Sequence, residues 1–173
     1  MFLDRIYKVF LSVNVLWVLI MRRKFKVVVV LLILIPLITI GYLWHIKGPK
    51  RVFKYVLDCR NPYGFEETKD EFVSDVFDIS DKNRNIMFVR ITFSGIGNFR
   101  IYGLKVIDPN NTTLLSIASI VRPLYTNITI SLDEKIEVST LGEYHIQFEA
   151  YINGWGQITV EVIIVAPIFE GFA

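Results

Sequence analysis

Cysteine is nearly absent from this chain of 173 residues: Cys59 is the single example, so no disulfide can form within the chain. Histidine is almost as scarce, with only His45 and His145. One histidine in the C-terminal part cannot make a clustered zinc site with one distant cysteine, and no Gly-x-Ser-x-Gly motif supplies a nucleophile. We therefore expect a protein that is not an enzyme, has no metal or cofactor, and is held together by packing.

Acidic residues are nearly absent from the N-terminal third. Residues 1–54 contain ten Lys and Arg against one acid, Asp4, a net +9, whereas residues 55–173 contain nine against sixteen, a net −7; the two sum to the +2 of the whole chain. An acidic C-terminal part repels phosphate, so we expect no nucleic-acid partner. The basic residues flank an apolar run, where anionic lipid head groups attract them.

Charge is wholly absent between Val27 and Trp44, which read VVVVLLILIPLITIGYLW. A helix rises about 1.5 Å per residue and needs roughly 20 apolar residues to cross a bilayer. Extended to Ile46, the run is long enough, and no small-residue cleavage site follows it. The sequence predicts a transmembrane signal-anchor at residues 27–46, in keeping with a mean hydropathy of +0.45.

The orientation of this anchor is not settled by the positive-inside rule, because four basic residues precede the run and four follow it closely. The first basic cluster usually dominates. Three N-x-[ST] glycosylation motifs, at Asn110, Asn111 and Asn127, make sense only outside the cytoplasm. We expect a single-pass protein of the cell membrane with its C-terminal domain outside.

Residues 1–26 allow two interpretations. The apolar stretch Ile6–Ile20 is short and contains Lys8 and Asn14. It is either a short second membrane segment or part of an over-extended reading frame in which Met21 is the true start. We favour the second interpretation, because Met21 begins a complete signal-anchor.

The remainder has little sign of helix. Residues 47–75 are predicted to be a juxtamembrane linker and residues 76–173 a β domain, with turns at Gly95–Asn98 and Asp108–Asn111 and a hairpin turn at Asn153–Gly156. About eight short strands at intervals near ten residues predict an all-β antiparallel sandwich, jelly-roll-like, after the N-terminal transmembrane helix. The expected strands include 86–94, 99–107, 114–121, 128–132, 136–139, 144–152 and 157–165.

The closing pair of strands is predicted in more detail. We expect Tyr144–Ile152 and Gln157–Val165 to pair with each other as a hairpin. Alternation then directs one set of side chains to the core and the other to water. The predicted core residues are Ile146, Phe148, Val160 and Val162, and the predicted exposed residues are His145, Glu149 and Glu161.

Two stretches, Gly103–Asn110 (GLKVIDPN) and Leu141–Phe148 (LGEYHIQF), resemble the "v-x-d-P-n-g … G-x-Y-x-i-x-f" pattern of small extracytoplasmic sandwiches. The chain is similar in this to GOLD domains and pre-peptidase C-terminal domains, over roughly residues 76–165. It differs from eukaryotic GOLD proteins in its N-terminal anchor and lack of a coiled coil, so no cargo-receptor role is implied. The resemblance implies a binding or structural module outside the membrane.

Candidate sites are few. Cys59 could join two chains by a disulfide, and three aromatic residues, Trp155, Tyr151 and Tyr144, could stack on a ligand. Gly95-x-Gly97 lacks the third glycine and the following helix of a dinucleotide fingerprint. The oxygen-rich segment 78–85 lacks the glycine and glutamate of an EF-hand, so we expect a surface loop there.

The functional prediction is a membrane-anchored extracytoplasmic module that binds, or forms part of, a surface or envelope assembly. A protein partner is expected on the outer face or in the membrane. Two alternatives remain open: an accessory subunit of a larger membrane complex, and a carbohydrate-binding jelly roll.

Overall fold

The computed structural model describes residues 27–46, 48–60 and 67–172. The chain divides after Ile46 into two units. The predictions made for residues 1–26 lie outside the described part of the chain.

The first unit contains one described helix, Val27–Ile46, of 20 residues. It is long and apolar enough to cross a membrane, as predicted. Pro36 cannot donate a backbone hydrogen bond within this helix, and three residues later Thr39 Oγ1 donates to the carbonyl of Ile35 at 2.8 Å. This bond gives the Thr39 hydroxyl a partner within the helix, whereas the carbonyl deprived of its usual donor by Pro36 is that of Leu32.

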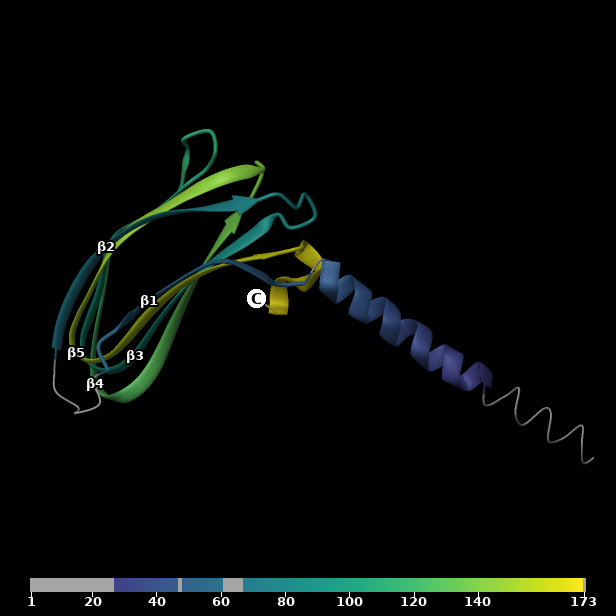
Figure 1. Cartoon of the computed structure of the whole chain (residues 1–173), viewed down its shortest axis with the longest axis horizontal. Helices are drawn as coiled ribbons and strands as arrows, with labels where there is room; N and C mark the ends of the chain where they lie inside the picture. The colour runs from purple at the N-terminus through teal and green to yellow at the C-terminus, as the bar shows by residue number, and fades with distance from the viewer. Residues whose placement is uncertain (1–26, 47, 61–66, 173) are drawn as a thin grey trace, which may run out of the picture. The chain divides into compact units, whose positions relative to one another are not determined.

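The second unit is one five-stranded antiparallel sheet (Figure 1). The strand order is β1-β5-β3-β4, and β2 also pairs with β5. A short 3₁₀ helix, η1, follows the last strand. The bounds are β1 Lys50–Asp58, β2 Glu67–Ile79, β3 Ile86–Ile107, β4 Thr113–Glu137, β5 Gly142–Val165 and η1 Pro167–Phe172.

Three of the strands are unusually long, with 22 to 25 residues each, and serve both halves of a bent sheet. Half A contains β1 with residues 86–95, 128–137 and 157–165; half B contains β2 with residues 97–107, 113–124 and 142–154. Figure 1 shows the sheet curving back on itself between the halves. We call this the bend, and the opposite end, where loops 80–85 and 138–141 join the halves, the open end.

The inner faces of the two halves meet in an aromatic and aliphatic core. Tyr55 of half A and Phe148 of half B lie edge to face, with ring centroids 5.3 Å apart. Phe93 and Phe99, one on each side of the bend, are 6.2 Å apart. Aromatic pairs therefore join the two halves both across the core and at the bend.

The alternation predicted for the end of the chain is largely confirmed. The four residues predicted to face the core, Ile146, Phe148, Val160 and Val162, have at most 1% exposure. His145 and Glu149 are exposed, as predicted. Glu161 is only partly exposed, because Arg51 of the neighbouring β1 pairs with it at 2.9 Å and covers it.

The predicted strand count was wrong. The structure has five strands instead of about eight, because the expected short strands merge into long ones. β3 and β5 each contain two of them, and β4 contains two together with the start of a third, 136–139. The segments Gly95–Asn98 and Asn153–Gly156 are not turns but lie inside β3 and β5, where they pair with each other. Residues 144–152 and 157–165 therefore do not pair as a hairpin; they are successive parts of β5.

The predicted linker at residues 47–75 also differs from the structure, which places β1 and most of β2 there. Both are edge strands that pair only with β5 among the described strands. Their outer faces carry many charges, so the apolar alternation is weak and the segment resembles a solvated linker. The sheet thus begins at Lys50 rather than at residue 76.

Candidate binding surface at the bend

The bend is built by four glycines on adjacent strands. Gly95 pairs with Gly156, and Gly97 pairs with Gly154. The backbones approach so closely that a Cβ added at Gly97 would lie 2.7 Å from the Cα of Gly154, and closer still to the carbonyl oxygen of Asn153. Gly154 also has φ +146°, which side chains rarely allow. Only glycine lets the two strands cross the bend without reversing direction.

One residue of each strand stands between the paired glycines, on the outer side of the bend. Ile96 pairs with Trp155; 42% of Ile96 is exposed and Trp155 is half-buried. The neighbouring pair, Asn98 and Asn153, is exposed. The side chains that flank the glycines are therefore aromatic, aliphatic and amide.

Strand β4 adds the most exposed aromatic residue of the described sheet. Leu124 pairs with Gly97 and Ile128 with Gly95, so the three residues between them bulge opposite Ile96. Within this bulge Tyr125 is 87% exposed. An exposed tyrosine ring on a bulge offers a flat apolar face with a polar hydroxyl, which suits recognition.

We define the bend surface as Ile96, Asn98, Tyr125, Asn153 and Trp155. The three chain segments that supply it, 94–99, 123–132 and 153–158, contain no charged residue. It is an uncharged surface on a unit that is acidic as a whole. Its chemistry can accept an apolar or neutral polar partner, through ring stacking and amide hydrogen bonds.

The predicted stacking residues are separated by the structure. Trp155 lies on the bend surface. Tyr151 lies further along the outer face of β5, where the guanidinium of Arg100 is 5.3 Å from its ring centroid. Arg100 also donates from Nη1 to the hydroxyl of Tyr102 at 3.0 Å, which holds the pKa of Arg100 above its ordinary value. Tyr151 is thus already covered on one face by a cation.

Tyr144 cannot stack on a ligand, because its side chain is fully buried. Its ring stacks on Phe77 at 5.6 Å, and its hydroxyl donates to the carbonyl of Thr140 at 2.6 Å. Burial raises the pKa of Tyr144, and the charge of Asp108 adds to this rise. The alternation of β5 directs residue 144 inward, so its role is in the core.

Cys59 is also buried, with 1% exposure, and its backbone N–H donates to the carbonyl of Gly156 at 2.8 Å. An intermolecular disulfide would require the fold to open there, which contradicts the predicted cross-link. His145 is exposed, and its Nε2 lies 3.7 Å from Oε1 of Glu143. Among the described residues no group of three or more His, Cys, Asp or Glu side chains could hold a metal ion.

The three glycosylation motifs all lie on exposed chain. Asn110 and Asn111 are in the turn after β3, where Asp108 Oδ1 accepts hydrogen bonds from the backbone N–H groups of Asn110 and Thr112 at 3.0 and 2.7 Å. Asn127 lies in the β4 bulge beside the bend surface. Use of these motifs stays a prediction.

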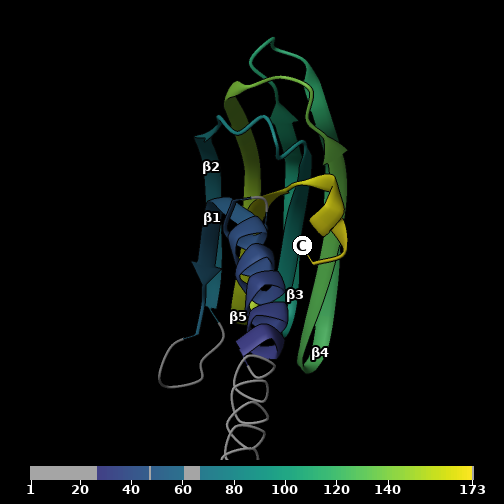
Figure 2. The same ribbon diagram turned by 90° about the vertical axis from the view of Figure 1, so that its right-hand side faces the viewer.

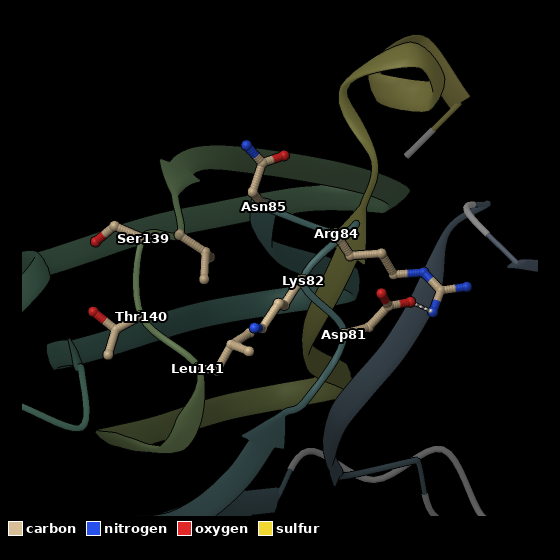
Figure 3. A pocket seen from close by; sticks show the side chains of 8 residues that line it. Asp81, Lys82, Arg84, Asn85, Ser139, Thr140 and Leu141 are labelled. Carbon is tan, nitrogen blue, oxygen red and sulfur yellow. Dashed lines mark hydrogen bonds and ion pairs between the residues drawn. The ribbon is translucent and has the colours of Figure 1, made fainter.

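A cavity of about 290 Å³ lies at the open end, between loops 80–85 and 138–141 (Figure 3). The buried Arg84 beside it donates from Nε to the carbonyl of Gly48 at 3.0 Å and pairs with Asp81 at 2.7 Å. The backbone N–H of Asn83 donates to Asp81 and is the main reason why the pKa of Asp81 is lowered. Arg84 thus ties the segment before β1 to the β2–β3 loop.

Sequence reasoning missed Tyr125, because it fell in a gap between two predicted strands. The available signal was the charge-free run from Pro123 to Leu132, which contains this tyrosine. The glycine-rich segments were predicted to be turns, whereas in the structure they are the places where β3 and β5 pass through the bend side by side.

No family model and no curated protein matches this chain. Among solved structures, TmCBM61 in complex with β-1,4-galactotriose is similar with 12% identity and a TM-score of 0.37, over 67% of this chain and 84% of that one. The C-terminal CBM6 of LamC from Zobellia galactanivorans has 12% identity and a TM-score of 0.34, over 68% and 98%. A cowpea mosaic virus particle has 11% identity and a TM-score of 0.36, over 68% and 88%. The neighbours of this antiparallel sheet are jelly-roll-like, and the proposals that follow depend on the residues of the chain itself.

Proposed function

We propose that this chain is a single-pass membrane protein whose β unit is a binding or structural module of a surface assembly, outside the cytoplasm. The helix Val27–Ile46 is its anchor, and the bent sheet is a jelly-roll-like sandwich in which halves A and B act as the two layers. The observation that carries the proposal is the bend surface: uncharged, aromatic and held by four glycines whose close backbone contacts leave no room for a Cβ.

The site of contact follows from exposure and charge. Tyr125 and Ile96 expose apolar area that the fold does not use, and the neighbouring amides of Asn98 and Asn153 can fix orientation. Aromatic residues in an uncharged centre are typical of protein interfaces, where charged groups are depleted. The expected partner is a protein of the same surface assembly.

A neutral carbohydrate is the second candidate ligand. Trp155 provides an indole face between two glycines, and amide side chains lie on both sides of it, at Asn153 and Gln157. Sugar rings stack on such faces, and amides can bond their hydroxyls. If the ligand is a carbohydrate, the wild-type chain should be retained on a column of neutral polysaccharide and Trp155→Ala should abolish this retention. If the partner is a protein, the wild-type chain should show no retention on the polysaccharide.

The test of the protein-binding proposal places a photo-crosslinking amino acid at residue 125 or, as a matched control, at residue 76. Val76 is exposed, lies on the outer face of half B and is distant from the bend. In native membranes we expect one discrete crosslinked adduct from residue 125 and none from residue 76. The adduct from residue 125 should disappear when Trp155→Ala is introduced into the same chain. Equal labelling from both positions would contradict a role for the bend surface.

The topology is tested separately by adding protease to intact cells. Removal of the β unit is expected. Protection until lysis would show that the unit faces the cytoplasm and would overturn the extracytoplasmic part of the proposal.

A further inference from the structure

Strand β4 forms one edge of the sheet along its whole length. It has 25 residues, pairs only with β3 among the described strands, and ends the strand order (Figure 2). An edge strand presents a row of backbone N–H and C=O groups to any strand that approaches. Proteins usually protect such an edge with charges, proline or a cover.

The opposite edge is protected in this way. Phe53 of β1 and Phe77 of β2 approach to 6.4 Å between ring centroids and close the core between the halves. The two strands also carry many exposed charges. The exposed charged residues of β1 and β2 are Lys50, Arg51, Lys54, Lys69, Asp70, Glu71, Asp75 and Asp78.

The β4 edge has this protection only locally: Pro123 and the bulge interrupt it at the bend, and its charges gather at residues 133–137. From Thr113 to Leu132 its only charged residue is Arg122. The aliphatic side chains along it pack against the core but are only partly buried, so this side of the core is still open. These residues are Leu114, Leu115, Ile117, Ile120, Ile130 and Leu132.

We propose that a second copy of this chain covers the β4 edge, in a dimer whose two-fold axis runs along the strands. Residues 113–124 run from the open end to the bend in half B, and residues 128–137 run back in half A. A rotation of 180° about such an axis places half B of one copy beside half A of the other. Each copy's 113–124 segment then lies antiparallel to the other's 128–137 segment, so two identical seams form.

The side chains match across this crossed seam. Ile120 of one copy lies four residues before Leu124, and Leu132 of the other copy lies four residues after Ile128. The two residues are therefore level with each other in the dimer, and both pack on the core side. One and two residues further, Ser119 and Ala118 are level with Asp133 and Glu134 of the other copy. The uncharged part of one segment therefore faces Glu134 and Asp133 of the other, the latter already paired with Arg90 of its own chain at 2.8 Å.

The uncrossed arrangement is less favourable. It would pair residues 128–137 with themselves and bring Asp133 and Glu134 near their own copies, where like charges repel. The crossed dimer also keeps both open ends at the same end of the assembly. Arg84 holds Gly48, just before β1, at the open end. The N-terminal ends of the two β units therefore lie on one side, as two anchors in one membrane require.

The inference goes beyond the proposed function and does not require a ligand at the bend. The experiment compares two charge variants of the full chain in detergent micelles, by mass photometry over a concentration series. Ala118→Glu with Ser119→Glu adds acids opposite Asp133 and Glu134, and Ala118→Lys with Ser119→Lys adds bases at the same exposed positions. The wild type is expected to be a dimer, the Glu variant to dimerise at least ten-fold more weakly, and the Lys variant no more weakly than the wild type.

Two results would overturn the proposal: a monomeric wild type at every concentration, or equal weakening by Glu and Lys. Thermal unfolding midpoints show whether each variant is folded, and Ser74→Glu on β2 is the control for added charge on the other edge.

Should the Glu variant not fold, disulfide trapping gives a second measurement. Val121 and Ser131, three residues from the bend on the two segments, are exposed and level in the crossed dimer. Co-expressed Val121→Cys and Ser131→Cys chains should form the mixed disulfide. A predominant Val121→Cys homodimer would refute the crossed arrangement.

Discussion

Substitution of Gly154 by alanine tests whether the bend depends on the close approach of two backbones. A Cβ at this position would lie 2.7 Å from the Cα of Gly97 and closer to the carbonyl oxygen of Ile96. These neighbours are backbone atoms and cannot rotate away. Overpacking in a tight core costs about 1–3 kcal/mol, and an unfavourable backbone region costs a further 1–3 kcal/mol or so.

Gly103 provides the matched control. Its φ of +58° is also positive, but a Cβ there would meet no described heavy atom within 4 Å. Gly103→Ala therefore carries only the backbone cost, about 1–2 kcal/mol. The difference between the two variants isolates the crowding.

The assay is equilibrium unfolding of the full chain in detergent, followed by tryptophan fluorescence and by circular dichroism. We expect Gly154→Ala to lower the free energy of unfolding by about 2–6 kcal/mol, a large share of the roughly 5–15 kcal/mol typical of domains. Gly103→Ala should lose at least about 1 kcal/mol less. Equal losses in the two variants would refute the argument that backbone contact shapes the bend.

The remaining predictions concern the helix, the core and the open end. Leu34→Arg should cost about 2.5–3.5 kcal/mol on insertion scales and release the chain from alkaline-washed membranes, whereas retention would argue against a span at residues 27–46. Phe148→Ala should cost about 3–5 kcal/mol through lost burial and a cavity, and His145→Ala less than about 0.5 kcal/mol, both by urea unfolding; a costly His145→Ala would indicate a site at that residue. The folded pKa of Asp81 is lowered, so its contribution to stability is complete above the ordinary carboxyl pKa and is lost as pH falls through the folded pKa. Unfolding midpoints should therefore fall on acidification below about pH 4 in the wild type and less so in Asp81→Asn, and identical acid profiles would contradict this.

The sequence was sufficient to predict an apolar helix at residues 27–46 and an antiparallel all-β unit, because a charge-free run and period-2 alternation are local signals. Alternation also identified the inward residues of β5, because every second residue from Ile146 to Val162 faces the core without interruption of this pattern. The strand count failed at Gly97 and Gly154. A glycine pair permits either a chain reversal or a close crossing of two strands, and only the partner strand decides between them.

The binding surface was only partly predictable for the same reason. Trp155 was identified as an aromatic residue, but the sequence could not show that Tyr144 points inward or that a bulge in β4 brings Tyr125 opposite Ile96. The resemblance to GOLD and pre-peptidase C-terminal domains stays a prediction. Exposure of a single ring depends on register between strands far apart in the chain, which local patterns do not encode.

The central position of β5 has a consequence for the order in which the protein folds. β5 is the last strand, yet β1, β2 and β3 all pair with it, and Lys50 cannot pair until Ile164 has been made. Loops this long close slowly, because their entropy is lost before any contact compensates for it. During synthesis β1 and β2 therefore stay unpaired until β5 has emerged. Their many charges disfavour pairing of these unpaired strands with strands of another chain.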